Sequence, residues 1–230
     1  MKNYLVIGGS GGIGLSIVKL LQQRGESVIA TYNENNPGDL DPGIVFHHYD
    51  VLDPSAKIDF LPDELHGLAY CPGSINLKPF SRISPEEFIK DYQLQVIGAV
   101  KVIQSSIPAL KAGHGSVVLF STVAVQVGLP FHSLVSASKG AIEGLVRSLS
   151  AELAPTIRVN CIAPSLIDTP LSATLLNTEQ KREANAQRHP LKRIGTADDI
   201  ANMAGFLLSE NSGWVTGQVF HVDGGMSAIK

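Results

Sequence analysis

The sequence predicts an α/β protein in which a doubly wound parallel sheet lies between two layers of helices. Short apolar runs alternate along the chain with longer segments whose apolar residues recur at helical spacing. The runs are continuous rather than alternating, which is typical of parallel strands buried on both faces. The 230 residues, 44% of them hydrophobic, can fill one sizeable core. No repeat, low-complexity tract or linker divides them, so we expect a single domain over residues 1–230.

Each strand is predicted from an apolar run and each helix from a periodic segment. The predicted strands are Tyr4–Ile7, Ser27–Thr31, Gly43–Tyr49, Gly67–Tyr70, Ser116–Ser121, Ile157–Ile162 and Val219–Val222. The predicted helices are Ile13–Gln23, Pro85–Ala112, Ser136–Leu153 and Ala197–Leu208. Between Tyr32 and Tyr70, turn residues leave room for at most a short helix, over Pro54–Leu65. The fold is therefore expected to be shortened between its second and fourth strands, with one face of the sheet incompletely covered there.

Charge and cysteine content exclude several classes of function. The 18 basic and 21 acidic side chains give a net charge of −3, which predicts no nucleic-acid or membrane partner. Cys71 and Cys161 cannot form a disulfide framework or a four-thiolate zinc site. His47 and His48 are neighbours on a predicted strand and point to opposite faces, so no metal site is expected. The apolar stretches are too short for a signal peptide or a membrane span, so we expect a cytoplasmic location.

A glycine-rich loop follows the first predicted strand and leads directly into the first predicted helix. It reads Gly8-Gly9-Ser10-Gly11-Gly12-Ile13-Gly14. Such a loop lets backbone N–H groups and a helix N-terminus face a pyrophosphate without intervening side chains. Two spacings fit it: G-x-G-x-x-G from Gly9, and G-x-x-x-G-x-G from Gly8. A strand–helix turn that binds no ligand is the alternative.

The second spacing resembles the short-chain dehydrogenase/reductase family, and motifs along essentially the whole chain follow that family's order. These motifs are Asp50-Val51, Tyr70-Cys71-Pro72-Gly73, Ser138-Lys139-Gly140-Ala141, Arg158-Val159-Asn160, Ala163-Pro164-Ser165, Gly195, Asp198-Asp199-Ile200-Ala201, Thr216-Gly217-Gln218 and Val222-Asp223-Gly224-Gly225. The resemblance implies a Rossmann-type fold and hydride transfer between a nicotinamide cofactor and a small carbonyl or alcohol substrate. It also implies a homotetramer or a homodimer.

The family's active-site roles fall on specific positions of this chain by resemblance. The ribose-binding lysine corresponds to Lys139, the serine that holds the substrate oxygen to Thr122 (with Ser121 beside it), and the helix asparagine to Gln95. The tyrosine that passes the proton corresponds to Val135, and no tyrosine occurs between Ser121 and Lys139. Valine has no proton to give, so catalysis here implies an altered proton route. General acid catalysis typically contributes about 10²–10⁴-fold, so the loss predicts slower turnover rather than none.

His132 is the candidate that the sequence offers for this proton route. It lies three residues before Val135, in the loop that leads into the predicted helix, and histidine titrates near neutral pH. A loop histidine without a catalytic role is the alternative. Ser136 and Ser138 could place a hydroxyl near the cleft, but they are expected to cap the helix that begins there. The Thr122 hydroxyl is too weak an acid to replace a phenol unaided.

The resemblance also predicts a dinucleotide site. Its residues are Gly8, Ser10, Gly11, Gly12, Ile13, Gly14, Asn33, Asp50, Val51, Cys71, Pro72, Gly73, Lys139, Pro164, Ile167 and Thr169. NAD-preferring folds usually end the second strand with an acidic residue, whereas Tyr32 and Asn33 stand there. Gly11 and Leu15 occupy the loop positions where the family often has a basic residue. NADP or NAD is therefore expected, with a slight preference for NADP.

Three functions are compatible with these residues. The first is an NAD(P)-dependent oxidoreductase with an altered proton route, and Lys139, Thr122 and Thr169 favour it. The second is a non-catalytic dinucleotide-binding protein, a sensor or partner subunit, and the missing tyrosine favours it. The third is a lyase or isomerase that reuses the groove. The segment Leu166–His189 resembles the family's variable substrate lid and mixes leucines with charged residues, which suits a partly apolar small molecule.

Overall fold

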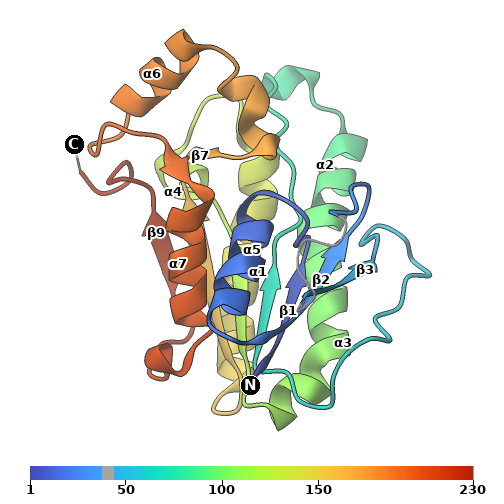
Figure 1. The fold of residues 1–230 in the computed structure, drawn as a ribbon. Helices are drawn as coiled ribbons and strands as arrows, with labels where there is room; N and C mark the ends of the chain where they lie inside the picture. Colours follow the sequence, from blue (N-terminus) through green and yellow to red (C-terminus); the bar gives the residue numbers. More distant parts are fainter. Residues whose placement is uncertain (38–43, 230) are drawn as a thin grey trace.

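A computed structural model describes residues 1–37 and 44–229 and has the predicted α/β architecture (Figure 1). Seven parallel strands form one sheet in the order β3-β2-β1-β4-β5-β6-β9. Their bounds are β1 Asn3–Ile7, β2 Ser27–Tyr32, β3 Ile44–His48, β4 Gly67–Tyr70, β5 Ser116–Phe120, β6 Arg158–Pro164 and β9 Val219–Val222. The strand order reverses between β1 and β4. At such a reversal, the loops at the carboxyl edge of an open sheet leave a crevice for ligands.

Helices cover both faces of the sheet (Figure 1). On one face, α1 (Gly12–Gln23) and α7 (Ala197–Leu207) pack side by side. On the other face lie α3 (Gly98–Ala112) and α5 (Ser133–Leu153). Most strand residues between the two layers are buried. That burial is why their sequences read as unbroken apolar runs.

The sheet is sparsely covered between β2 and β4, as predicted. β3 is only partly buried, and Val45 is 54% exposed. The described residues between these strands form no helix, and the irregular segment 49–66 instead places Ile58 and Phe60 against the core. The Phe60 ring stacks on His47, with ring centroids 4.1 Å apart. The predicted strand start at Gly43, and most of the predicted turn before it, lie outside the described residues.

The long helix predicted over Pro85–Ala112 is divided in the structure. α2 (Pro85–Tyr92) is followed by a π-helical turn over Gln93–Ile97, after which α3 begins. The Leu94 carbonyl in this turn accepts a hydrogen bond from the Tyr70 hydroxyl (2.6 Å). A π turn adds one residue to a helix and supplies no signal of its own in the apolar pattern, so the sequence predicted one continuous helix.

Several shorter elements complete the described chain. They are α4 Ala124–Val127, α6 Glu179–Gln187, the paired strands β7 Ile167–Asp168 and β8 Gly195–Thr196, and 3-10 helices at Phe80–Arg82, Pro170–Leu175 and Glu210–Ser212. α6 belongs to the segment predicted to be a substrate lid, and it projects beyond the sheet at the top of Figure 1. Within residues 1–37 and 44–229, no helix has both the length and the apolar character to cross a bilayer.

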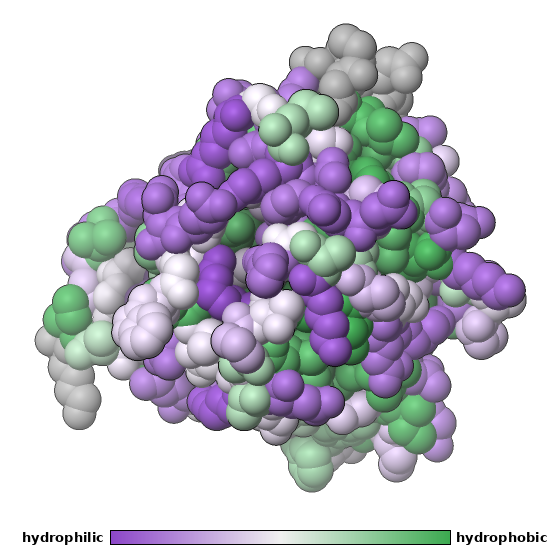
Figure 2. Space-filling model, turned by 90° about the horizontal axis from the view of Figure 1, so that it is seen from below, coloured by the Kyte–Doolittle hydropathy of each residue, from purple (hydrophilic) through white to green (hydrophobic). Residues whose placement is uncertain are grey.

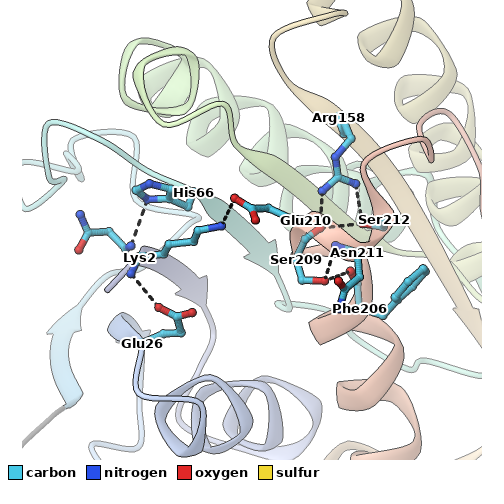
Figure 3. A network of polar contacts seen from close by, with 10 residues as sticks. Lys2, Glu26, His66, Arg158, Phe206, Ser209, Glu210, Asn211 and Ser212 are labelled. Carbon is cyan, nitrogen blue, oxygen red and sulfur yellow. Dashed lines mark hydrogen bonds and ion pairs between the residues drawn. The ribbon is translucent and has the colours of Figure 1, made fainter.

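The amino edge of the sheet, opposite the crevice, is closed by polar contacts (Figure 3). Lys2 donates its backbone N–H to Glu26 (2.7 Å) and its ammonium group to Glu210 (2.5 Å). Arg158, at the start of β6, donates to Ser212 Oγ (2.7 Å) and to two backbone carbonyls (2.9 and 3.3 Å). Figure 2 views the molecule from below, and hydrophilic side chains cover much of that face. These contacts tie the start of the chain to its C-terminal third.

Candidate active site

A cavity of about 260 Å³ opens at the carboxyl edge of the sheet. Its lining is mainly apolar and combines the segments that follow β4 and β5 with Pro164 and residues of the segment 165–189. Ten predicted site residues line it: Ile13, Cys71, Gly73, Gln95, Thr122, His132, Lys139, Pro164, Ile167 and Thr169. The fold therefore brings together residues that are separated by up to 156 positions in the sequence, from Ile13 to Thr169.

The other predicted cofactor residues lie outside this cavity. They are Gly8, Ser10, Gly11, Gly12, Gly14, Asn33, Asp50, Val51 and Pro72, and they follow the carboxyl ends of β1, β2, β3 and β4. Asn33 is exposed, and Asp50 accepts a hydrogen bond from the Leu52 N–H (2.9 Å). Val51 is buried against the start of α3. These residues extend the site from the cavity along the same edge of the sheet.

The glycine loop is shaped by its own backbone. Gly8 has a φ of +72° and donates its N–H to Thr31 Oγ1 (3.0 Å). A Cβ on Gly14 would lie 2.2 Å from the Gly8 carbonyl oxygen, so only glycine fits there. α1 has no acidic residue in its first turn, and its N-cap Gly11 makes no side-chain cap. The N–H groups of that turn therefore remain available for an anion such as a pyrophosphate.

Loops from β4 and β6 close on this glycine loop. A Cβ on Gly8 would lie 3.3 Å from Pro72, and a Cβ on Gly12 would lie 3.4 Å from the Thr169 side chain. The structure thus brings the glycine loop beside the segments that the resemblance assigns to the two ends of a dinucleotide. The space between these loops and the glycine loop is narrow, so a ligand bound there would contact backbone atoms rather than long side chains.

Val135 and Lys139 stand one turn apart on α5, and both line the cavity. The Val135 side chain is buried, and among the described residues no tyrosine lines the cavity. Burial lowers the pKa of Lys139 to about 8, although Cys161, Asp91 and Cys71 nearby oppose the shift. Lys139 therefore exchanges its proton close to neutral pH.

A buried carboxylate on α2 fixes the groups around Lys139. Asp91 Oδ2 accepts hydrogen bonds from Gln95 Nε2 (2.8 Å) and Ser138 Oγ (2.6 Å), and Oδ1 accepts from Ser74 Oγ (2.5 Å). Since its amide nitrogen faces Asp91, Gln95 turns Oε1 the other way. Among the described residues this buried oxygen has no hydrogen-bond partner.

The Gln95 carbonyl and the Lys139 ammonium face the same small space. Gln95 Oε1 and Lys139 Nζ would each lie 3.6 Å from a Cβ on Gly73. An unpaired acceptor and an ammonium group in that arrangement can hold a ligand hydroxyl between them. The prediction that Ser138 caps α5 was wrong, because the helix begins at Ser133 and the Ser138 hydroxyl bonds Asp91 instead. Ser136 likewise lies inside the helix rather than at its cap.

Two hydroxyls follow β5 at the cavity wall, and their hydrogen bonds distinguish them. Ser121 Oγ donates to Glu143 Oε1 (2.7 Å), so its proton is committed. Thr122 Oγ1 accepts a hydrogen bond from the Ala124 N–H (3.3 Å), which leaves the Thr122 proton free to reach a substrate oxygen. The geometry favours Thr122 over Ser121 as a donor to the cavity.

His132 is the N-cap residue of α5 and lines the cavity. Its Nδ1 lies 2.7 Å from the Pro130 carbonyl oxygen. A carbonyl only accepts, so Nδ1 carries a hydrogen. The remaining nitrogen, Nε2, is the atom from which a protonated ring would donate to a ligand.

Packing surrounds both cysteines and His48. Cys161 is fully buried in β6, and burial raises the pKa of the Cys71 thiol at the cavity wall to about 12. The His48 ring lies edge-on to Tyr32, with centroids 5.5 Å apart. In the part of the chain that the structure describes, no group of three or more His, Cys, Asp or Glu residues is placed to hold a metal ion.

Two polar residues of the cavity were missed by the sequence analysis. Ser165 Oγ lies 2.8 Å from His189 Nε2, and both residues line the cavity. They are 24 residues apart, and no periodicity or spacing connects them. Asp91 was missed as well, although it stands one helical turn before Gln95, where an acceptor for the amide could have been sought.

Comparison with known proteins agrees with this geometry. A family model described as enoyl-(acyl carrier protein) reductase matches residues 50–227. A tropinone reductase homologue of Arabidopsis thaliana is 34% identical, and the match covers 98% of this chain and 92% of the relative. L-xylulose reductase of Bos taurus is 31% identical over 99% of this chain and 97% of its own length. The solved structure of aldohexose dehydrogenase from Thermoplasma acidophilum superposes with a TM-score of 0.92 at 26% identity, covering 100% of this chain and 95% of the other.

The chain therefore belongs to the short-chain dehydrogenase/reductase family. Its relatives bear the names of reductases and dehydrogenases, which supports an NAD(P)-dependent oxidoreductase. The glycine loop at the end of β1 and Lys139 on α5 occupy the positions expected for this family and fold.

Proposed function

We propose that this chain interconverts a small carbonyl compound and its alcohol in the cavity, with NADP or NAD along the carboxyl edge of the sheet. The observation that carries the proposal is that the glycine loop, Lys139 and Thr122 converge on one crevice. Two relatives, L-xylulose reductase and aldohexose dehydrogenase, are named for sugars, whereas this cavity has a mainly apolar lining. A substrate with a largely apolar skeleton suits that lining.

The residues present fit a dinucleotide. The uncapped first turn of α1 suits the pyrophosphate, and Lys139 with Gln95 suits ribose hydroxyls. Thr169 and Ile167 stand at the cavity wall where a nicotinamide would lie. When bound, the nicotinamide supplies or accepts the hydride, and the protein supplies position and the proton.

We further propose a slight preference for NADP over NAD. Tyr32 and Asn33 at the end of β2 present no carboxylate to repel a 2′-phosphate, and Gly11 and Leu15 offer no basic side chain to bind one. The two dissociation constants should therefore differ by less than about tenfold, which corresponds to about 1.4 kcal/mol.

The proposed proton route uses Thr122 and His132. Thr122 donates a hydrogen bond from its hydroxyl to the substrate oxygen, which positions that oxygen while Thr122 keeps its own proton. Protonated His132 then delivers the proton from Nε2, because the Pro130 carbonyl occupies Nδ1. Val135 contributes only an apolar wall where the family has its acid.

Titration with NADPH and NADH tests the cofactor half of this proposal. Nucleotide fluorescence and thermal unfolding are followed together, since a ligand at a hundred times its Kd stabilises the fold by about 2.7 kcal/mol. Micromolar binding of either nucleotide is the expected result. If neither binds at millimolar concentration, the oxidoreductase proposal fails and protein partners become the next target.

One variant tests the proton route. His132→Ala should lower turnover by roughly 10²-fold and change its pH profile, and an unchanged rate and profile would exclude His132 as the donor.

A second candidate function, non-catalytic dinucleotide binding, is favoured by the buried valine at position 135. If Val135→Tyr reduces carbonyl compounds and the wild-type protein does not, the wild-type protein is a non-catalytic dinucleotide-binding protein.

A further inference from the structure

Ser165 and His189 form a fixed polar pair in the wall of the cavity. The His189 side chain is 3% exposed, and its Cβ and Cδ2 lie 3.5 and 3.6 Å from the place a Cβ on Gly224 would take. Its Nδ1 is 2.9 Å from the Asn185 carbonyl oxygen, and its Nε2 is 2.8 Å from Ser165 Oγ. The imidazole is therefore held in one orientation by packing against Gly224 and by the hydrogen bonds at its two ring nitrogens.

The Asn185 backbone carbonyl only accepts, so Nδ1 carries a hydrogen. A buried ring with no carboxylate among its hydrogen-bond partners is favoured in its neutral form, in which Nε2 presents a lone pair. Ser165 Oγ then donates its single proton to Nε2. Met226 Sδ lies 3.1 Å from the same oxygen, but a thioether is a weak acceptor and the imidazole nitrogen takes the proton.

With its proton committed, Ser165 offers only lone pairs to the cavity. We infer that Ser165 is a specificity residue that accepts a hydrogen bond from a hydroxyl of the substrate, other than the oxygen of the reacting carbonyl. The substrate class is accordingly a hydroxy ketone on an apolar skeleton, or the corresponding diol in the reverse direction. This inference rests on the proposed function and adds the substrate class to it.

The same geometry disfavours substrates that bear only an acceptor at that place. An ether or a second carbonyl oxygen would face the Ser165 lone pairs, so both oxygens would stay without a hydrogen. A hydroxyl and its methyl ether have similar inductive effects on a neighbouring carbonyl. Comparing the two therefore isolates the hydrogen bond from the intrinsic reactivity of the ketone.

The experiment measures kcat/KM for reduction of two hydroxy ketones and their methyl ethers. The probes are 2-hydroxyacetophenone and 3-hydroxypropiophenone, which place the hydroxyl at two distances from the carbonyl on an aromatic skeleton. One neutral hydrogen bond changes affinity by about three- to tenfold, so the wild type should prefer at least one hydroxyl compound over its ether by that factor. Ser165→Ala should abolish the preference, and Ser165→Thr, which keeps the hydroxyl, should restore it.

Nucleotide binding separates failure of this inference from failure of the proposed function. NADPH and NADH dissociation constants are measured for each variant, because Ser165 follows Pro164 at the predicted nicotinamide site. If nucleotide binds and the ethers react as well as the hydroxyl compounds, the substrate class is overturned while the proposed function stands. The class is also overturned if nucleotide binds but no probe reacts or stabilises the complex thermally, or if Ser165→Ala keeps the wild-type ratio. If no nucleotide binds, the proposed function itself fails.

Discussion

The two edges of the parallel sheet treat their polar groups in opposite ways. At the amino edge, Lys2 binds Glu26 and Glu210, and Arg158 is held by three acceptors (Figure 3). At the carboxyl edge, Gln95 Oε1 is buried without a partner in the described part of the chain, and the Lys139 pKa is lowered by burial. The polar groups named at the amino edge are satisfied within the protein, whereas Gln95 Oε1 at the carboxyl edge is left for a ligand.

This difference teaches how one scaffold divides stability and function between its edges. An unpaired buried acceptor costs roughly 1–3 kcal/mol, which the fold tolerates where a ligand later supplies the partner. Contacts at the amino edge lie at the opposite ends of the strands from the crevice, so we expect them to affect folding and not ligand binding. Substitutions at the two edges should therefore separate unfolding from ligand binding.

The largest effect is expected from Gly14→Ala. The new Cβ would lie 2.2 Å from the Gly8 carbonyl oxygen, so the glycine loop must shift and the pyrophosphate cradle is lost. Nucleotide affinity should fall at least about 100-fold, or about 2.7 kcal/mol, as measured by fluorescence titration. The thermal midpoint should fall by several degrees as well.

Gly11→Ala is the matched control for that steric effect. A Cβ at Gly11 would meet no atom within 4 Å, and its φ of −160° is open to alanine. Its thermal midpoint should remain at the wild-type value. Equal midpoints for both variants would contradict the account of the loop.

Arg158→Met should break the amino edge without touching the crevice. Three acceptors lose a charged donor, which predicts a loss of about 2–4 kcal/mol in the free energy of unfolding, measured by urea denaturation. The nucleotide Kd should stay within twofold of the wild type.

Lys139→Met should show the reverse pattern. The nucleotide Kd should rise, whereas the free energy of unfolding should not fall, because the substitution removes a buried charge. Parallel changes in both quantities for either variant would argue against the division between edges.

A smaller effect is expected in the pH dependence of reduction. Lys139, with a pKa of about 8, is charged below that pH and neutral above it. In the proposed mechanism the charged form of Lys139 binds the ribose hydroxyls, so reduction should slow as pH rises through about 8. We call this fall in rate above pH 8 the limb of the pH–rate profile. In Lys139→Arg the limb should be absent below pH 10, because a guanidinium keeps its proton. Persistence of the limb in that variant would assign it to another group.

Asp91→Asn sharpens the same measurement. The Asp91 carboxylate raises the Lys139 pKa against the effect of burial. Its neutralisation should therefore move the limb to lower pH, while asparagine retains an acceptor for Ser138 or Gln95. A limb that moves upward or stays in place would show that Asp91 has only a packing role.

The sequence predicted the scaffold well because its signals are local. Apolar runs fix which segments are strands, and the glycine loop marks the end of β1. The fine structure of the site depends on contacts between distant segments. Ser138 was expected at a cap but bonds Asp91 across two helices, and the π turn that carries Gln95 has no apolar signature. The Ser165–His189 pair joins the end of β6 to a residue 24 positions further along the chain, and no local pattern signals it.

The central claim is that the crevice at the carboxyl edge carries out hydride transfer without a tyrosine. The most direct test is to incubate the wild-type protein with NADPH or NADH deuterated at C4 and a broad panel of aldehydes and ketones that includes the four named above. Mass spectrometry of the products follows. The account predicts one deuterium on the carbinol carbon, transferred from only one of the two C4 positions. Nucleotide binding with no deuterium in any product would contradict it and leave a dinucleotide-binding protein in its place.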